Sequence, residues 1–279
     1  MTRQRVFVLT LLAMLAFAGN SLLCRMALLH TAIDAASFTS IRIVSGAIAL
    51  GLIVRLRSEP RRLLGSWGSA TSLFAYAAAF SFAYVSLTAA TGALLLFGAV
   101  QATMIGYGRW KGERLRARQT AGLVMASAGV VGLLLPGLSA PPLQGSVLML
   151  AAGVAWGVYT LRGKGSGDPL RVTAGNFVRA AGLAVALCAA MLPWASIDRA
   201  GAGYAIASGA LASGLGYAVW YTALAGLKVT GAATVQLSVP VIAALGGVVF
   251  LDESVTLRLV IASVAILGGI ALVVIDRRP

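Results

Sequence analysis

Charged side chains are scarce in this sequence. They make up 11% of the 279 residues, whereas hydrophobic residues make up 59%. A soluble globular domain carries charge on about a quarter of its residues. The mean hydropathy is correspondingly high, at +0.91. This composition is not that of a soluble domain, and it predicts an integral membrane protein.

Acidic residues are the rarest charged group, and every one falls in an expected loop or at a helix end. They are Asp34, Glu59, Glu113, Asp168, Asp198, Asp252, Glu253 and Asp276. Proton-driven antiporters commonly relay protons through a carboxylate deep in the membrane. The lack of such a group favours facilitated diffusion or exchange. Proton coupling would instead have to use Glu113, Glu253 or the histidine His30.

Histidine and cysteine are almost missing. The chain has one histidine, and its two cysteines, Cys24 and Cys188, both lie within apolar runs. These residues do not form a metal-binding cluster. Neither a His-Glu-x-x-His motif nor a phosphate-binding Gly-x-x-x-x-Gly-Lys motif occurs. We therefore expect no metal, no cofactor and no enzymatic activity, and an integral membrane enzyme is the most distant alternative.

Long apolar runs are what the sequence has in place of charge. A membrane-spanning helix needs about 20 apolar residues, and candidate spans fill most of the chain. They are 6–29, 35–54, 67–87, 91–108, 118–135, 145–162, 171–192, 202–224, 231–250 and 257–275. The sequence therefore predicts an all-α integral membrane protein with ten transmembrane helices.

Basic residues are numerous and unevenly distributed. The chain has 22 Lys and Arg residues and a formal charge of +14. If the N-terminus is cytoplasmic, most of them fall in loops on the cytoplasmic side, which is the positive-inside pattern. We therefore predict two cytoplasmic termini in a bacterial inner membrane. The charge reflects this topology, so we expect membrane lipid as a partner and no nucleic acid.

The two halves of the chain resemble each other. The segment Gly112–Arg118 aligns with Asp252–Arg258, and Phe17–Ser21 aligns with Trp156–Thr160. Each half contains five predicted spans, and five is odd, so the second half must enter the membrane from the opposite side. Inverted repeats of this kind are typical of secondary transporters.

We therefore divide the chain into two five-helix repeats of one integrated membrane domain, 1–137 and 138–279. An arginine lies early in the second helix of each repeat, at Arg42 and Arg179. Together with Gly112-Glu-Arg-Leu and Asp252-Glu-Ser-Val between the fourth and fifth helices, this ordered set resembles the drug/metabolite transporter superfamily, EamA type. The resemblance implies movement of small metabolites, often export, without ATP.

A narrower resemblance concerns the sixth and eighth spans. Trp156 and the segment Gly216–Trp220 are similar to YddG-type exporters of aromatic amino acids. The sequence departs from many relatives at Phe17, where they have Trp. Its fourth span also lacks a proline corresponding to Pro240. The narrower resemblance implies amino acids, including aromatic ones, as substrates.

Two aromatic faces are candidates for the lining of a substrate cavity. Rings recur at helical spacing in the third and eighth spans, at Tyr76, Phe80, Tyr84, Tyr217, Trp220 and Tyr221. Ligand pockets are typically lined by such side chains. Core packing, or an aromatic belt at the membrane surface, is the alternative.

Polar and amphipathic residues within other spans are further candidates. Asn20 lies in the first span, Trp156 and Tyr159 in the sixth, and Gln101 and Gln236 in the fourth and ninth. Polar groups are costly in hydrocarbon unless they meet a partner or a watery cavity. We therefore expect them to face the interior, where they either line the cavity or form hydrogen bonds between helices.

Arg42 and Arg179 each have two interpretations. A buried arginine can bind a substrate carboxylate, or it can hold helix ends together through backbone carbonyls. Their matched positions favour the structural role. Pro240, in the middle of the ninth span, predicts a kink or hinge.

The sequence as a whole predicts a secondary transporter that exports small metabolites by alternating access. We expect amino acids, including aromatic ones, to move by facilitated diffusion or exchange. A proton-coupled drug/metabolite antiporter is the alternative. The expected partners are a small-molecule substrate and lipid, and a monomer is consistent with the sequence.

Overall fold

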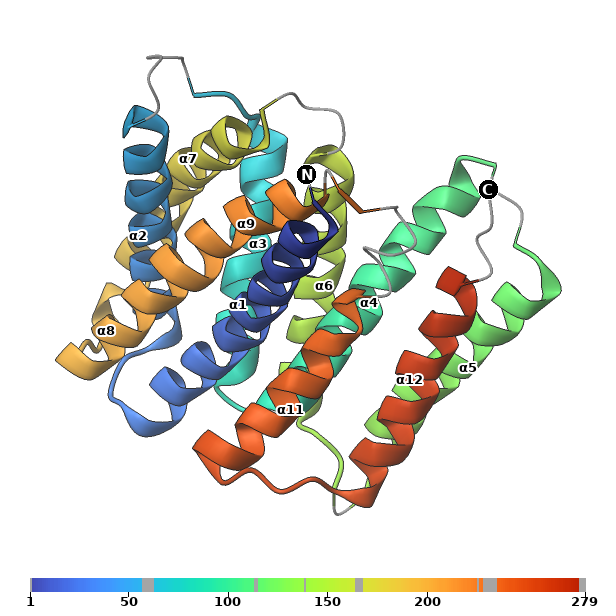
Figure 1. The fold of residues 1–279 in the computed structure, drawn as a ribbon. Coiled ribbons are helices and arrows are strands. Elements are labelled where there is room, and N and C mark those ends of the chain that lie inside the picture. Colours follow the sequence, from blue (N-terminus) through green and yellow to red (C-terminus); the bar gives the residue numbers. More distant parts are fainter. Residues whose placement is uncertain are drawn as a thin grey trace.

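The computed structural model describes residues 2–56, 63–112, 115–137, 139–163, 168–224, 226–227 and 235–275. This described part of the chain is helical and contains no strand (Figure 1). Its elements are α1 (Arg3–His30), α2 (Ala35–Leu56), α3 (Trp67–Tyr84), α4 (Ala89–Trp110), α5 (Ala117–Leu134), α6 (Leu143–Gly163), α7 (Pro169–Ala190), η1 (Leu192–Trp194), α8 (Arg199–Ile206), η2 (Ala207–Leu215), α9 (Gly216–Leu224), α11 (Ser238–Leu251) and α12 (Leu257–Ile275).

Seven of the described helices are long and apolar enough to cross a membrane. They are α1, α2, α4, α5, α6, α7 and α12. This confirms an all-helical, multi-pass membrane protein. The predicted span 67–87 corresponds to the helix α3, and 202–224 falls within the continuous helical run of α8, η2 and α9. Of the predicted span 231–250, residues 231–234 lie outside the described residues.

Pro240 does not interrupt the middle of α11. The helix begins at Ser238, so Pro240 lies in its first turn. The first backbone N–H groups of a helix have no partner within the helix, and proline is therefore tolerated there without a kink. Residues 235 and 236 are also helical and Leu237 is a turn, so the helical run of the ninth span changes just before Pro240. The kink or hinge expected in this span stays a prediction.

Several helices begin at a side chain that accepts a hydrogen bond from the first turn. Ser66 caps α3, Thr88 caps α4 and Asp168 caps α7. Asp34 caps α2 by accepting from Ala36 N and Ser37 N at 2.9 and 3.0 Å. These four side chains fix where each helix begins, so they also position the loops that precede the helices.

Asp34 also joins two loops, which makes it a test of acid stability. Its carboxylate accepts from Ser196 N at 2.9 Å. Partial burial raises the pKa of Asp34, but hydrogen bonds from the Ser37 side chain and from the N–H groups of Ser37, Ser196 and Ala36 outweigh it and hold the pKa below its ordinary value. A lowered pKa means that the stabilisation is present at neutral pH and is lost as the pH falls below about 4.

We expect Asp34→Ala to lower the free energy of unfolding by about 1 kcal/mol at pH 7, as for other lost caps. The Tm in detergent should fall by about 2–4 °C, and the difference from wild type should shrink below about pH 4. Asp34→Asn, which keeps an acceptor oxygen without the charge, is the matched control. A difference between wild type and Asp34→Ala that stays constant from pH 7 to pH 3.5 would contradict the role of the charge.

Close helix pairs depend on glycine. A Cβ added at Gly122 on α5 would lie 2.5 Å from the carbonyl oxygen of Gly269 on α12, so these two helices approach backbone to backbone. On α6, Gly153 fits against Leu96 and Ala99 of α4 in the same way. Small residues at interfaces allow this packing in membranes, where no hydrophobic effect drives helices together. In Figure 1, α5 and α12 lie side by side at one edge of the bundle, and α1, α3 and α6 lie nearer its centre.

Candidate functional site

Arg42 of α2 is fully enclosed by neighbouring helices, with only 2% of its surface exposed. Its Nε donates to Ser213 Oγ of η2 at 3.3 Å, and its Nη2 donates to Tyr76 OH of α3 at 3.1 Å. The guanidinium carbon lies 4.8 Å from the ring centre of Phe80 and 5.2 Å from that of Tyr76. Two aromatic faces therefore stabilise the cation.

The guanidinium group is not fully satisfied. Its Nη1 has no hydrogen-bond partner among the described residues. Arg42 forms no ion pair with any described carboxylate, so none of them neutralises its charge. A buried charge without a counter-ion is costly. Arg42 therefore keeps one donor and a full charge available for an anionic ligand.

A chain of hydrogen bonds continues from Arg42 across the bundle. Tyr76 OH accepts from Asn20 Nδ2 of α1 at 3.2 Å, and Asn20 Oδ1 accepts from Ser208 Oγ of η2 at 2.6 Å. With the bond to Ser213, the chain begins and ends on η2. These hydrogen bonds bring α1, α2, α3 and η2 together at one point and leave Arg42 Nη1 as the open donor.

The two serines face the same network because η2 is a π-helix of nine residues. Ser208 and Ser213 are five residues apart, and the wider turn of a π-helix brings their side chains closer to one direction than an α-helix would. Gly209 lies against the Arg42 backbone and lets η2 approach α2 closely. Sequence reasoning missed these serines. The signal was the Ser-Gly pair that recurs at the same interval, Ser208-Gly209 and Ser213-Gly214.

Aromatic rings surround this network, with Trp156 of α6 at their centre. Its ring centre lies 4.9 Å from that of Tyr76 and 4.8 Å from that of Tyr217. Tyr159 lies on the same helix at 5.4 Å, and Phe17 of α1 contacts Trp156 edge-on at 6.4 Å. Trp156 thus joins the two aromatic faces that were identified from the sequence.

Trp220 is part of the same cluster, because its ring centre lies 5.8 Å from that of Phe17. The cavity among these rings is small, at about 20 Å³. It is lined by Phe17, Asn20, Ser21, Tyr76, Phe80, Leu96, Phe97, Trp156 and Tyr217. A space of this size holds about one water molecule. The described conformation is therefore closed around the site.

Other candidates from the sequence lie outside the cavity. Tyr84 is buried at the end of α3, packs over Gly92 and donates to Ala89 O, which is a packing role. Tyr221 is half-buried and packs against the hydrophobic core. Gln101 and Gln236 are buried, but neither lines the cavity; Gln101 Nε2 has no partner among the described residues.

Arg42 and Arg179, which the predicted repeat aligns, have different environments. Arg179 is half-buried, and its Nη1 donates to Gly175 O at 2.8 Å and to Leu64 O at 3.1 Å. Arg179 therefore holds the segment before α3 against α7 through carbonyl groups. Arg42 contacts side chains and rings in the centre of the bundle.

An ion pair closes one end of the bundle. Arg25 Nε lies 3.0 Å from Glu253 Oε1, and both side chains are about nine-tenths buried. Arg25 Nη1 also donates to the carbonyls of Tyr84 and Val85, at 3.0 and 3.2 Å, while Glu253 Oε2 accepts from Ala89 N at 2.8 Å. The pair thus joins α1, the α3–α4 loop and the α11–α12 loop.

Hydrogen bonds join the helices at the opposite end. Asn176 Oδ1 of α7 accepts from Ser66 N before α3 at 3.0 Å, and Asn176 Nδ2 donates to Tyr159 OH of α6 at 3.5 Å. The cavity is therefore enclosed from both sides. Of the acidic residues considered from the sequence, Glu59, Glu113 and Asp276 lie outside the described residues.

Together these features define a multi-pass helical membrane protein with a small, closed polar and aromatic site between its helices. Residues 143–275 match the EamA-like transporter family. The chain is 56% identical to the uncharacterized protein PA1977 of Pseudomonas aeruginosa, over 99% of this chain and 97% of that protein. The chain belongs to the EamA-like transporter family, within the drug/metabolite transporter superfamily.

A solved crystal structure has the same fold. It superposes over 100% of both chains with a TM-score of 0.69, at 20% sequence identity. At this identity the similarity concerns the fold alone. It is consistent with the membership of the transporter family, whose members move small molecules across membranes.

Proposed function

We propose that the protein is a secondary transporter of small metabolites that combine a carboxylate with an apolar or aromatic body, with export of amino acids, including aromatic ones, as its activity. One observation carries this proposal: Arg42 is buried without a described counter-ion, beside a closed cavity lined by aromatic rings. A carboxylate would satisfy the open Nη1 donor with a charge-assisted hydrogen bond, and the rings would hold the body of the substrate.

Alternating access is the proposed mechanism, and helix pairing supports it. The second, fourth and fifth helices of the segment 1–137 pack against their counterparts in 138–279: α2 against α7, α4 against α11, and α5 against α12. An inverted repeat of five plus five helices relates such pairs by a two-fold axis. The positive-inside charge pattern supports ten spans with both termini in the cytoplasm of a bacterial inner-membrane protein.

Facilitated diffusion or exchange is favoured over proton coupling. The described carboxylates of Asp34, Asp168, Asp198, Asp252 and Glu253 lie in loops or at helix ends. No described carboxylate therefore occupies the position of an intramembrane proton relay.

Transport by purified protein in liposomes tests the function. Liposomes preloaded with an aromatic amino acid should take up the labelled compound by counterflow without an imposed proton gradient. Tyramine, which lacks the carboxylate of tyrosine, should be transported at least ten-fold less efficiently, because a hydrogen bond to a charged group contributes about 1.5–3 kcal/mol. Equal transport of the two compounds would contradict carboxylate recognition, and transport only with a proton gradient would support the proton-coupled alternative.

The central ring gives a second test. Trp156→Ala should raise the KM for aromatic amino acids by about 3- to 10-fold, since an aromatic pair contributes about 0.5–1.5 kcal/mol beyond its buried area. The KM for alanine, which has no ring, should change less. Trp194→Ala is the matched control, because Trp194 is 69% exposed. An equal loss for both substrates together with a lower folding yield would assign Trp156 to helix packing.

A further inference from the structure

The exposed side of α2 carries an apolar ridge between two grooves. Val44, Ile48 and Leu52 form the ridge, since they line both grooves. Ile48 and Leu52 are 59% and 53% exposed. One groove, of about 590 Å³, lies between α2 and α7; the other, of about 610 Å³, lies between α2 and the start of the η2 run.

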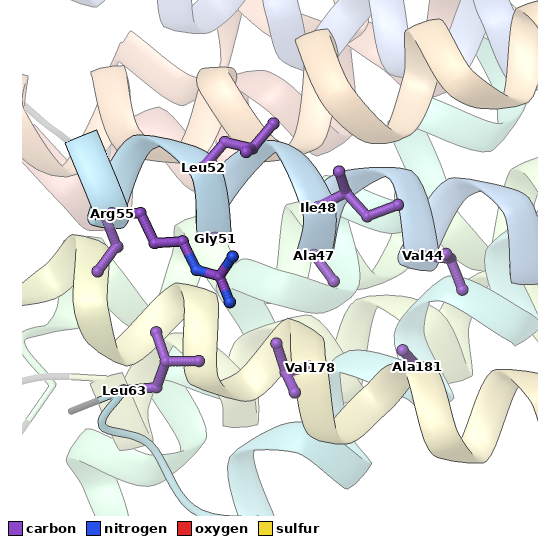
Figure 2. A pocket seen from close by; sticks show the side chains of 10 residues that line it. Val44, Ala47, Ile48, Gly51, Leu52, Arg55, Leu63, Val178 and Ala181 are labelled. Carbon is purple, nitrogen blue, oxygen red and sulfur yellow. The ribbon is translucent and has the colours of Figure 1, made fainter.

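Both grooves suit hydrocarbon. In the first, Val178 and Ala181 of α7 face Ala47 and Gly51 of α2, as Figure 2 shows. The second groove is also walled by aliphatic side chains, apart from two serines. The hydroxyl of Ser40 donates to backbone carbonyls of α2 and α7, and that of Ser45 to the carbonyl of Arg42. Because these hydroxyls already donate within the protein, the grooves do not require a polar occupant.

A cation lies at one end of the ridge. Arg55 follows Val44, Ile48 and Leu52 on the same helical face and is exposed. In Figure 2 its guanidinium group lies between α2 and α7, at the groove. The described residues form no ion pair or hydrogen bond with it. An anion at this position would meet a charge that no described residue neutralises, at the end of the groove between α2 and α7.

The length of the ridge matches one leaflet of a bilayer. Val44 and Arg55 are eleven residues apart, which corresponds to about 16 Å along a helix at 1.5 Å per residue. The hydrocarbon core of a bilayer is about 30 Å thick, so each leaflet contributes about 15 Å. A chain that starts at Arg55 and follows the groove would reach Val44 at about the middle of the membrane.

We propose that this face of α2 binds one anionic diacyl phospholipid. One acyl chain lies in each groove, astride Val44, Ile48 and Leu52, and the phosphate contacts Arg55. The charge at the end of the ridge, the paired grooves and their length all fit this occupant. The lipid site is separate from the cavity beside Arg42. The proposal does not depend on the transport activity, because its test measures lipid binding.

Native mass spectrometry of the detergent-purified protein tests the site by titration with dioleoyl phosphatidylglycerol or dioleoyl phosphatidylcholine. We expect one phosphatidylglycerol adduct to form at lower concentration than a phosphatidylcholine adduct. Arg55→Gln should weaken phosphatidylglycerol binding about five-fold, the effect of one basic residue at a membrane surface. Arg5→Gln, which changes another exposed arginine, is the charge control and should leave binding unchanged.

Filling one groove tests the position of the chains. A Cβ added at Gly51 meets no atom within 4 Å, so Gly51→Leu should fold normally while its side chain occupies the groove. It should weaken binding of diacyl phosphatidylglycerol to the level of the single-chain lysophosphatidylglycerol. Gly132→Leu on α5, where an added Cβ also meets open space, is the matched control.

Three results would overturn the proposal. The first is that wild type binds phosphatidylglycerol no better than phosphatidylcholine and that Arg55→Gln binds phosphatidylglycerol as well as wild type does. The second is displacement of phosphatidylglycerol by millimolar glycerol phosphate, which would show that only the free anion is recognised. The third is a dimer that disappears in Gly51→Leu, which would assign the face to a second copy of the chain.

Discussion

Arg42→Gln should lose at least ten-fold, and up to about 100-fold, in kcat/KM for substrates that carry a carboxylate, because it removes a charged hydrogen-bond donor from the site. The reason is the environment of the guanidinium group. It bonds to Ser213 and Tyr76 but keeps Nη1 open, and no described carboxylate balances its charge. A substrate carboxylate would accept a hydrogen bond from Nη1 and would balance the positive charge.

Thermal stability separates this role from a structural one. If Arg42 mainly stabilises the fold, Arg42→Gln should lower the Tm in detergent together with transport. If it binds substrate, removal of a buried, unbalanced cation should leave the Tm unchanged or higher, because such a charge is costly to bury. We expect the second result, with loss of the preference for tyrosine over tyramine.

Two variants serve as controls for Arg42. Arg42→Lys keeps the charge but not the planar donor group, so it should recover part of the activity. Arg179→Gln changes the arginine that the predicted repeat aligns with Arg42, which donates to two backbone carbonyls among the described residues. Arg179→Gln should lower the Tm without changing the preference for tyrosine over tyramine. Unchanged discrimination in Arg42→Gln would refute carboxylate binding at this residue.

Glu253→Gln should destabilise the described conformation by about 3–5 kcal/mol, the cost of leaving one member of a buried ion pair without its partner. Arg25 would keep its hydrogen bonds to the α3–α4 loop but lose its counter-charge. Since this pair closes one end of the bundle, the variant should favour conformations that are open at that end. The expected readouts are a lower Tm and faster labelling of Cys24, which directly precedes Arg25 in α1 and is buried in wild type.

A double-mutant cycle isolates the pair. Arg25→Gln and Glu253→Gln should each destabilise the protein, and the double variant should be less affected than the sum of the two, because it leaves no unpaired charge. Asp252→Asn is the matched control, since Asp252 adjoins Glu253 but is exposed. Additive effects of the two substitutions, or an equal effect of Asp252→Asn, would show that the ion pair is not a closing contact.

Much of the fold could be predicted from composition and pattern. Long apolar runs account for the described helices because a chain in lipid must satisfy its backbone hydrogen bonds internally. The family resemblance rested on motifs readable in the sequence, and the match over residues 143–275 confirms it. The spacing of Tyr76, Phe80 and Tyr84 predicted one aromatic face; Tyr76 and Phe80 line the small cavity, whereas Tyr84 packs over Gly92.

The candidate site was less accessible to sequence reasoning. Pattern alone could not tell Arg42 from Arg179, because both occupy the same place in the predicted repeats and only their neighbours differ. Ser208 and Ser213 both contact the network from η2, whose wider π-helical turn brings residues five apart closer to one face than an α-helix does. Arg25 and Glu253, far apart in the chain, meet through helix packing.

The sequence by itself thus determined the class of protein, the positions of most helices and the supply of aromatic and basic residues. Those properties follow from the local requirement for apolar length and satisfied backbone groups in a bilayer. Only the tertiary structure decided which side chains meet. Membrane helices are apolar around much of their circumference, so their rotation and pairing depend on close contacts such as Gly122 with Gly269 and on polar bonds between distant segments.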